Sequence, residues 1–199
     1  MHANSPVLRP TVQPAGAKER IIDAAYELFS RQGTRSVGVD AIIERSGVAK
    51  MTLYRHFRSK QDLVIAFLQR REQPWTKEWL EPQVRAHADD PKGRLIAIFD
   101  LFDEWFQQPE FEGCPFINVL LEYEPGNKIR VAAAEHLAQI RAFLMGLAIE
   151  AGMIDAKAFV DVWHMLMKGS IIAASGGNRD AAKEARRAAK LLLENWPAA

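Results

Sequence analysis

The stretch VDAIIERSGVAKMTLYRHF, from Val39 to Phe57, decides the fold of the N-terminal part of this chain. Two short runs with helical periodicity, VDAIIERS and KMTLYRHF, are separated by three residues that begin with Gly47. Two short helices that meet at a tight turn containing glycine form a helix-turn-helix. The sequence therefore predicts this motif, with the second helix presenting its outer face to another molecule.

The second run divides into an inner and an outer face when it is laid out at about 100° per residue. Leu53 and Phe57 fall on one side and, together with Val48, are expected to anchor the helix on the protein. The opposite side holds three residues that we expect to meet the base edges of DNA: Met51, Thr52 and Arg55. Arginine bridges two acceptors of guanine in the major groove, and a flexible apolar side chain contacts the methyl group of thymine.

Four neighbouring residues have the chemistry of phosphate contacts, which position a protein on DNA without reading its sequence. They lie on the flanks of the same helix and at the start of the next one: Lys50, Tyr54, His56 and Lys60. The alternative is that these residues form the solvated polar face of a small core helix. Helix-turn-helix geometry also occurs in proteins that bind no DNA, so the spacing leaves both interpretations open.

The net charge of +1 hides an asymmetry along the chain. Residues 1–73 contain twelve Lys and Arg against seven Asp and Glu, whereas residues 74–199 contain fourteen against eighteen. A basic segment beside an acidic one is typical of proteins whose basic part meets a polyanion. A chance distribution of a few charges explains the same counts, so the asymmetry supports DNA binding without establishing it.

The whole chain predicts an all-α protein of about nine helices, because helical periodicity recurs along it and alternating apolar–polar runs do not. The expected helices span about 17–32, 39–46, 50–57, 60–73, 92–107, 115–123, 128–151, 156–174 and 180–195. Pro74, Pro82 and Pro91 mark a less regular region after the fourth helix. Three parts are expected: a flexible arm at 1–16, a helix-turn-helix DNA-binding domain at 17–63, and a helical ligand-binding and dimerisation domain at 64–199.

The composition places few other constraints on the class of protein. Cys114 is the only cysteine, which excludes an intrachain disulfide and fits a reducing, cytoplasmic compartment. The first 16 residues contain three prolines and lack the basic start and apolar stretch of a secretion signal. Runs of about 18 apolar residues, which a membrane-spanning helix needs, are lacking.

The segment from Glu19 to Val64 resembles the DNA-binding domain of the tetracycline-repressor (TetR) family. The pieces that carry the resemblance are AAYELFSRQG, IIERSGVAK, TLYRHF and SKQDL. The resemblance implies a three-helix DNA-binding domain joined to a helical domain that binds a ligand and forms a twofold homodimer. It also implies that several residues lie where the family contacts DNA: Lys50, Thr52, Tyr54, His56 and Lys60. Arg55 falls at a variable position, which suits a role in choosing the operator.

Three residues depart from the family pattern. Gly38 stands where the family usually has Ser or Thr before the second helix, and it brings no hydroxyl to cap that helix. Ala49 and Met51 stand where the family tends to have Ser and a small residue around Lys50. These departures concern individual DNA contacts and leave the predicted fold unchanged.

Beyond Val64, aromatic and Met side chains predict an adaptable apolar cavity with a few polar groups. The candidates to line it are Phe102, Trp105, Phe116, Asn118, Glu122, Trp163 and Met167. Asn118 and Glu122 are one helical turn apart and offer polar contacts on one face. The alternative is that the apolar candidates are ordinary core and that the two polar ones face solvent.

The last two predicted helices are apolar and rich in small residues such as Gly169, Ala173 and Ala185. Small residues let helices approach closely, and two such helices from each of two chains make a four-helix bundle. We therefore expect a homodimer through these helices. Close packing within one chain is the alternative.

The sequence as a whole predicts a dimeric transcriptional regulator, more typical of a repressor, that a small, mostly apolar effector releases from palindromic operator DNA. No cofactor, metal or membrane partner is expected, and the five histidines lack metal-ligand spacing. One alternative is a DNA-binding regulator without a small-molecule ligand. A more remote one is a hydrolase using Cys114 with His136 or His164, although nothing in the sequence places either histidine near the thiol.

Overall fold

The computed structural model describes residues 16–198, except for the side chains of residues 73 and 74; the arm predicted at 1–16 lies outside this range apart from Gly16. The chain forms two compact units. Within the described residues, the N-terminal unit comprises 16–73 and 114–136, and the C-terminal unit comprises 74–113 and 137–198. The domain boundary predicted between residues 63 and 64 stays a prediction.

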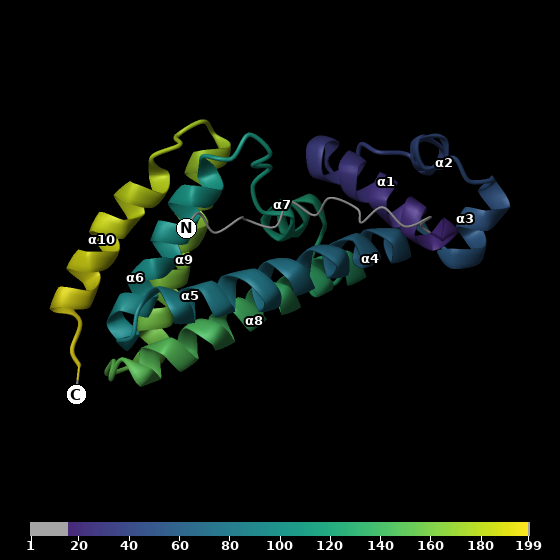
Figure 1. Ribbon diagram of the computed structural model, residues 1–199. Helices are drawn as coiled ribbons and strands as arrows, with labels where there is room; N and C mark the ends of the chain where they lie inside the picture. Colours follow the sequence, from purple (N-terminus) through teal and green to yellow (C-terminus); the bar gives the residue numbers. More distant parts are fainter. Residues whose placement is uncertain (1–15, 199) are drawn as a thin grey trace. The chain divides into compact units, whose positions relative to one another are not determined.

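All nine predicted helices are present in the described part of the chain (Figure 1). The N-terminal unit contains α1 (Ala17–Gln32), α2 (Val39–Ser46), α3 (Lys50–His56), α4 (Lys60–Glu72), α7 (Pro115–Glu122) and the start of α8 (Lys128–Glu150). The C-terminal unit contains α6 (Pro91–Phe106), α9 (Ala156–Ser175), α10 (Ala181–Asn195) and the rest of α8. None of the described helices is long and apolar enough to cross a membrane.

The region expected to be less regular is itself helical. It contains a π-helical segment, η1 (Gln73–Leu80), and a short helix, α5 (Glu81–His87). Pro82 lies in the first turn of α5, which continues directly from η1 with Leu80 still in helical conformation. Proline therefore lies within a continuous helical run here, whereas the sequence alone indicates only that it interrupts a helix.

The core of the N-terminal unit forms around α1, against which α2, α3 and α4 pack. Phe29 of α1 meets Phe67 of α4 edge to face, with ring centroids 5.5 Å apart, and Tyr26 approaches the same ring at 5.5 Å. Ile21 and Ala25 are fully buried on the same face of α1. The apolar stripe of the first helix thus holds the other three helices of the unit.

Helix ends in this unit follow from local residue chemistry. Gly47 ends α2 in the left-handed conformation, with φ 63° and ψ 28°, which glycine adopts without steric cost. Ser59 caps α4, because its Oγ accepts a hydrogen bond of 3.1 Å from the Asp62 N–H. Gly38 and Ala49 precede α2 and α3 without a side-chain cap.

In the C-terminal unit, α10 packs against α6 and α9, and α5 packs against α6. Arg186 of α10 pairs with Asp100 of α6 at 2.6 Å, and Arg179 donates a short hydrogen bond to the carbonyl of Phe106. At the end of the chain, the indole N–H of Trp196 donates to the carbonyl of Ile154 at 2.7 Å. These contacts fix both ends of α10 within the unit.

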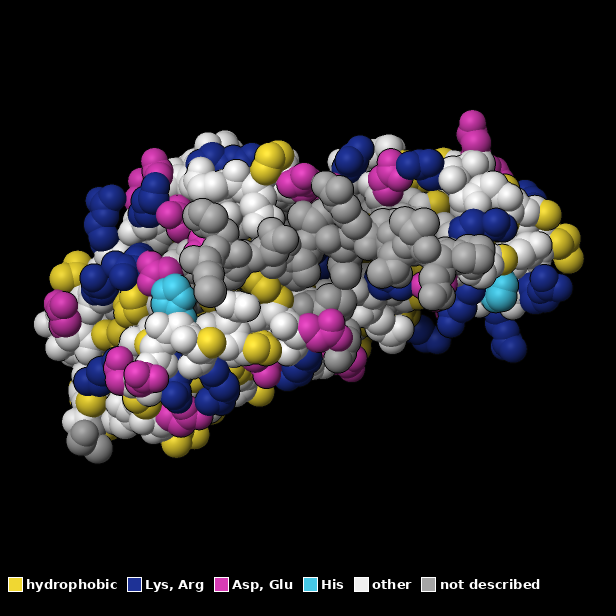
Figure 2. All heavy atoms as spheres, in the orientation of Figure 1, with side chains coloured by type: hydrophobic (Ala, Val, Ile, Leu, Met, Phe, Trp, Pro, Cys, Tyr) yellow, Lys and Arg dark blue, Asp and Glu magenta, His cyan; other side chains and the backbone are white. Residues whose placement is uncertain are grey.

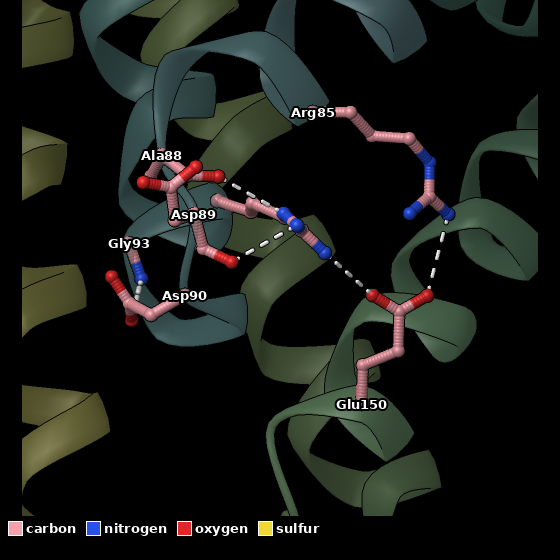
Figure 3. A network of polar contacts seen from close by, with 7 residues as sticks. Arg85, Ala88, Asp89, Asp90, Gly93 and Glu150 are labelled. Atoms are coloured by element: carbon pink, nitrogen blue, oxygen red, sulfur yellow. Dashed lines mark hydrogen bonds and ion pairs between the residues drawn. The ribbon is translucent and has the colours of Figure 1, made fainter.

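A polar cluster joins the start of α6 to the end of α8 (Figure 3). Arg94 donates to the carbonyls of Ala88 and Asp89, at 3.1 and 3.0 Å, and to the carboxylate of Glu150 at 3.2 Å. Arg85 of α5 approaches the other carboxylate oxygen of Glu150 at 3.3 Å. One carboxylate therefore gathers α5, α6 and α8.

Two histidines are buried in the units. His136 of α8 is 3% exposed and stacks on the ring of Phe116, with centroids 3.4 Å apart. Burial, reinforced by the charge of Arg71, lowers the pKa of His136 to about 4. His164 of α9 is 5% exposed, and burial, with the positive charges of Lys168 and Arg141, lowers its pKa to about 3.

We expect the free energy of unfolding to fall as the pH is lowered from about 6.5 towards 4. In that window the unfolded chain binds protons that His136 and His164 exclude in the folded chain, so acid favours unfolding by on the order of a few kcal/mol in total. Urea unfolding across this pH range measures the effect. The double variant His136→Gln, His164→Gln should flatten the dependence, and the variant of exposed His56, His56→Gln, should preserve it.

Candidate nucleic-acid interface

The inner face of α3 is buried as the sequence predicts. Leu53 is 1% exposed, Phe57 5% and Val48 8%. They hold the helix against the N-terminal unit, where α1 and α2 are its neighbours. The orientation of α3 is therefore fixed by three apolar side chains, and its other side chains point away from the core.

The outer face of α3 brings the predicted DNA-contacting residues together on one surface. Met51 is 79% exposed and Tyr54 39%, and Lys50, Arg55 and His56 are also exposed. Thr52 is half-buried at the edge of the same face. Figure 2 shows Lys, Arg and His side chains, with exposed apolar ones among them, over the region where Figure 1 draws α2 and α3. The surface combines cations, a hydroxyl group and a projecting apolar side chain.

The ends of α2 and α3 are joined by an exposed ion pair. Lys50 Nζ lies 3.5 Å from a carboxylate oxygen of Asp40, and both side chains are largely solvated. Exposed pairs of this length contribute about 0–1 kcal/mol. Lys50 is therefore available to exchange this carboxylate for a phosphate.

Lys60, at the start of α4, has a structural role that the sequence did not indicate. Its Nζ donates a hydrogen bond of 3.2 Å to the main-chain carbonyl of Arg35, in the α1–α2 turn. Partial burial lowers the pKa of Lys60, and the nearby Glu122 carboxylate opposes that shift. Its contact with phosphate stays a prediction, but the side chain also holds the turn that precedes α2.

A buried hydrogen-bonded cluster ties α7 to the same turn. Thr34 is 1% exposed, and its N–H and hydroxyl donate to the Glu122 carboxylate at 3.1 and 2.5 Å. The Tyr123 hydroxyl lies 2.9 Å from Thr34 Oγ1. At Gly33, which has φ +80°, an added Cβ would lie 2.9 Å from Glu122 Oε1. Glycine therefore lets the carboxylate approach the turn.

Residues that are 88 positions apart thus form one local structure in the N-terminal unit. The Arg35 guanidinium lies over the Tyr123 ring, 5.6 Å from its centroid, and completes the contact. We name this set the α7 clasp: Gly33, Thr34, Arg35, Glu122 and Tyr123. Sequence reasoning missed it because no periodicity connects the two segments.

The seven residues predicted to line a ligand cavity fall into different units. Phe102, Trp105, Trp163 and Met167 are buried in the C-terminal unit. The other three candidates belong to the N-terminal unit. Phe116 is buried against His136, Asn118 is exposed, and Glu122 is held in the α7 clasp. Their assignment to a cavity stays a prediction.

The cysteine and histidines considered for hydrolysis are distributed in a similar way. Cys114 precedes α7 in the N-terminal unit, and His164 belongs to the C-terminal unit. His136 shares the unit of Cys114, but its ring is stacked on Phe116. Cys114 and His164 thus belong to different units, whereas Cys114 and His136 belong to the same one.

Comparisons with known proteins identify what the helix-turn-helix segment is similar to. Residues 21–67 match the family described as bacterial regulatory proteins, tetR family. The regulator QacR of Staphylococcus aureus is 26% identical over 53% of this chain and 53% of its own length. The activator FasR of Mycolicibacterium smegmatis is 38% identical over 34% of this chain and 36% of its own. The chain thus matches about half or less of these relatives.

Solved structures extend the likeness beyond the helix-turn-helix. SCO4454, a TetR-family transcriptional regulator from Streptomyces coelicolor, superposes with a TM-score of 0.81 at 26% identity and covers 92% of this chain and 91% of its own. NemR of E. coli, in its reduced form, has a TM-score of 0.78 at 16% identity, which concerns the fold alone. The all-α fold predicted from the sequence is confirmed.

Replacing Glu122 by Gln should destabilise the N-terminal unit by about 1–3 kcal/mol, because a buried hydroxyl and N–H lose a charged acceptor. Urea unfolding measures the loss. Glu124→Gln, in the exposed segment two residues later, is the matched control and should change stability by less than about 0.5 kcal/mol. In a double-mutant cycle with Thr34→Val, the two substitutions should be non-additive; additive effects would contradict the clasp.

Proposed function

We propose, from the premise that this chain belongs to the TetR family of bacterial regulatory proteins, that it controls transcription as a homodimer on palindromic operator DNA. A small, mostly apolar effector, bound by the C-terminal unit, releases it. The protein acts in the cytoplasm. The observation that carries the proposal is the outer face of α3, which presents Lys50, Met51, Arg55 and their neighbours on one exposed surface.

On this surface, we expect some residues to contact bases and others to contact phosphates. Arg55 and Met51 project from the middle of the face, where a major groove presents guanine acceptors and thymine methyl groups. Lys50, Tyr54 and His56 lie where the groove edges carry phosphates. Thr52 and Lys60 complete the set from less exposed positions. A seven-residue helix fits within one major groove, so sequence reading is limited to a few base pairs per subunit.

A homodimer follows from the need to read both halves of a palindrome. Two recognition helices must lie about 34–36 Å apart to enter successive major grooves. In support of dimerisation, α9 and α10 border an open apolar groove of about 440 Å³, lined by residues such as Met165, Gly169 and Ala185. Ile172 and Leu191, on the same helices, are 55% and 62% exposed. A second copy of α9 and α10 would bury these side chains.

Release requires that the effector bind better to a conformation whose recognition helices are wrongly placed for DNA. The DNA-competent population then falls in proportion to that difference in affinity. The α7 clasp supports a route for this effect within the N-terminal unit, since it joins α7 to the turn before α2 through Thr34 and Glu122. A shift of α7 would displace the turn that positions the helix-turn-helix.

We propose repression as the direction of control, because a DNA-bound dimer blocks polymerase without further contacts. The relative FasR is named an activator, so activation is the second candidate. A regulator without a small-molecule effector is the third, and a failure of every compound tested to release operator DNA would favour it. Transcription in vitro from the regulated promoter, with and without the protein, distinguishes repression from activation.

A mobility-shift assay with DNA from upstream of its own gene tests the proposal directly. Specific binding should appear at low salt and weaken as salt rises, because phosphate contacts release counterions. Failure to shift any such DNA more than a random fragment, at every salt concentration, would contradict the proposed function.

Arg55→Ala and Lys50→Ala should separate base reading from phosphate binding. Arg55→Ala should cost about 1–3 kcal/mol on the operator and relax the preference at one base pair. Lys50→Ala should weaken binding to all sequences alike and reduce the slope of affinity against salt. Titrations of operator and single-base variants measure both effects, and equal losses on every sequence for both variants would refute the role of Arg55.

Met165→Glu should convert the dimer into a monomer, because it places a charge in the apolar groove between α9 and α10. Sedimentation velocity measures the change. Leu121→Glu, at a similarly exposed apolar residue of the N-terminal unit, is the control and should leave the dimer intact. A dimer that survives Met165→Glu at micromolar concentration would place the interface elsewhere.

A further inference from the structure

The π-helical segment η1 carries three buried polar groups that find no hydrogen-bond partner among the residues that the structure describes. The indole N–H groups of Trp75 and Trp79 and the hydroxyl of Thr76 make no hydrogen bond. Thr76 is 0% exposed and Trp79 4%. Buried polar groups are hydrogen-bonded in the great majority of cases, and each one left unpaired destabilises the folded state. Three within five residues therefore call for an explanation.

The two tryptophans of η1 belong to a cluster of aromatic rings in the C-terminal unit. The Trp75 ring lies 5.6 Å from that of Trp79, 6.2 Å from Phe102 and 5.2 Å from Trp105. The ring contacts continue from Phe102 through Phe99 to Trp163. Trp163 of α9 is fully buried, and its indole N–H is also unpaired. Unpaired donors thus recur along one set of contacting rings.

The backbone at this point is also unusual. π-Helical turns are rare, and most occur as single turns that coincide with functional sites. Here the π-helix extends over eight residues, and the three unpaired groups lie in its first seven. Two features therefore destabilise this segment: the poorer hydrogen-bond geometry of a π-helix and the unpaired donors.

The fold can satisfy an indole elsewhere in the same unit. Trp196 donates its N–H to the carbonyl of Ile154 at 2.7 Å. An unpaired indole N–H is therefore not common to every tryptophan in the C-terminal unit, although Trp163 of α9 shares it with the two tryptophans of η1. Trp196 also offers a matched control.

We propose that η1 is a binding segment for an uncharged, flat aromatic molecule that carries carbonyl or similar oxygen acceptors. The rings of Trp75, Phe102 and Trp105 supply faces and edges for a planar ligand, and Thr76, Trp79 and Trp75 supply donors. Indole N–H groups repel a cation. An anion would be buried there without a counter-charge from these side chains, at a large cost in free energy.

The η1 site rests on the proposed function in one respect: the ligand acts as an effector only if the protein is a ligand-responsive regulator. Binding by itself is a property of the C-terminal unit and is measurable without DNA. A ligand that pairs with the donors removes the penalty that the free protein carries, so affinity depends on the acceptor and not only on the apolar surface.

Two tricyclic probes that differ in one acceptor test the proposal on the full chain. 9-Fluorenone carries a carbonyl where fluorene carries a methylene group. Equilibrium dialysis should give at least tenfold tighter binding of fluorenone. Equal affinities, or no binding of fluorenone, would overturn the proposal, and so would tighter binding of the planar cation 9-aminoacridine.

Variants then locate the donors. Thr76→Val and Trp79→Phe keep shape or ring and remove one donor each, so each should lower the fluorenone-to-fluorene preference at least fivefold while changing fluorene affinity less than twofold. Trp196→Phe removes a donor that is already paired and should keep the preference. An unchanged preference in both η1 variants would overturn the site.

A stability measurement tests whether misfolding, and not the loss of a donor, causes a change in ligand preference. Without ligand, Thr76→Val should unfold at the same or a higher urea concentration than the parent chain, because it removes an unpaired hydroxyl. Trp196→Phe should unfold at a lower one. A destabilised Thr76→Val variant would mean that the hydroxyl is satisfied within the protein and would also overturn the proposal.

Mobility shifts with the same preparations separate this inference from the proposed function. Specific operator binding without selectivity for fluorenone overturns the η1 site and leaves the regulator intact. Selectivity for fluorenone without operator binding supports the η1 site and contradicts the proposed function. Release of operator by fluorenone but not by fluorene supports both.

Discussion

A helix of seven residues has no stability of its own in water, because nucleation costs more than so few hydrogen bonds return. α3 therefore exists only while Leu53, Phe57 and Val48 remain buried in the N-terminal unit. The same burial fixes the rotation of the helix and hence which side chains project into solvent. The surface that we propose to face DNA is thus a consequence of core packing, and a change in that packing should alter recognition without removing a proposed DNA contact.

Among the described residues, the polar groups of the α7 clasp are hydrogen-bonded, whereas those of η1 are buried and unpaired. In the α7 clasp, Thr34, Tyr123 and Glu122 satisfy one another, so the contact is specific and resists displacement. In η1, the donors of Trp75, Thr76 and Trp79 have no partner among the described residues. A satisfied cluster stabilises one arrangement, whereas an unsatisfied one favours any partner that supplies acceptors. This contrast is consistent with the proposal that the N-terminal unit binds DNA and the C-terminal unit binds an effector.

Most of the fold could be predicted from local sequence signals. Helical periodicity gave the nine main helices, and Gly47 and Ser59 gave two of their ends, because these features depend on residues within one or two turns. The sequence did not predict η1 and α5. Pro74 and Pro82 indicate a break, and only packing of the following residues decides whether the chain leaves the helix or continues it with altered hydrogen bonding.

The candidate site was likewise predictable in part from local sequence and in part not. The sequence by itself determined the inner and outer faces of α3, because seven consecutive residues at a fixed angular step leave little else to decide. Only the tertiary structure placed Glu122 on Thr34, gave Lys60 its bond to the Arg35 carbonyl, and left the η1 donors unpaired. Contacts between residues that are distant in sequence depend on how whole helices pack, and no local pattern of residues specifies that packing.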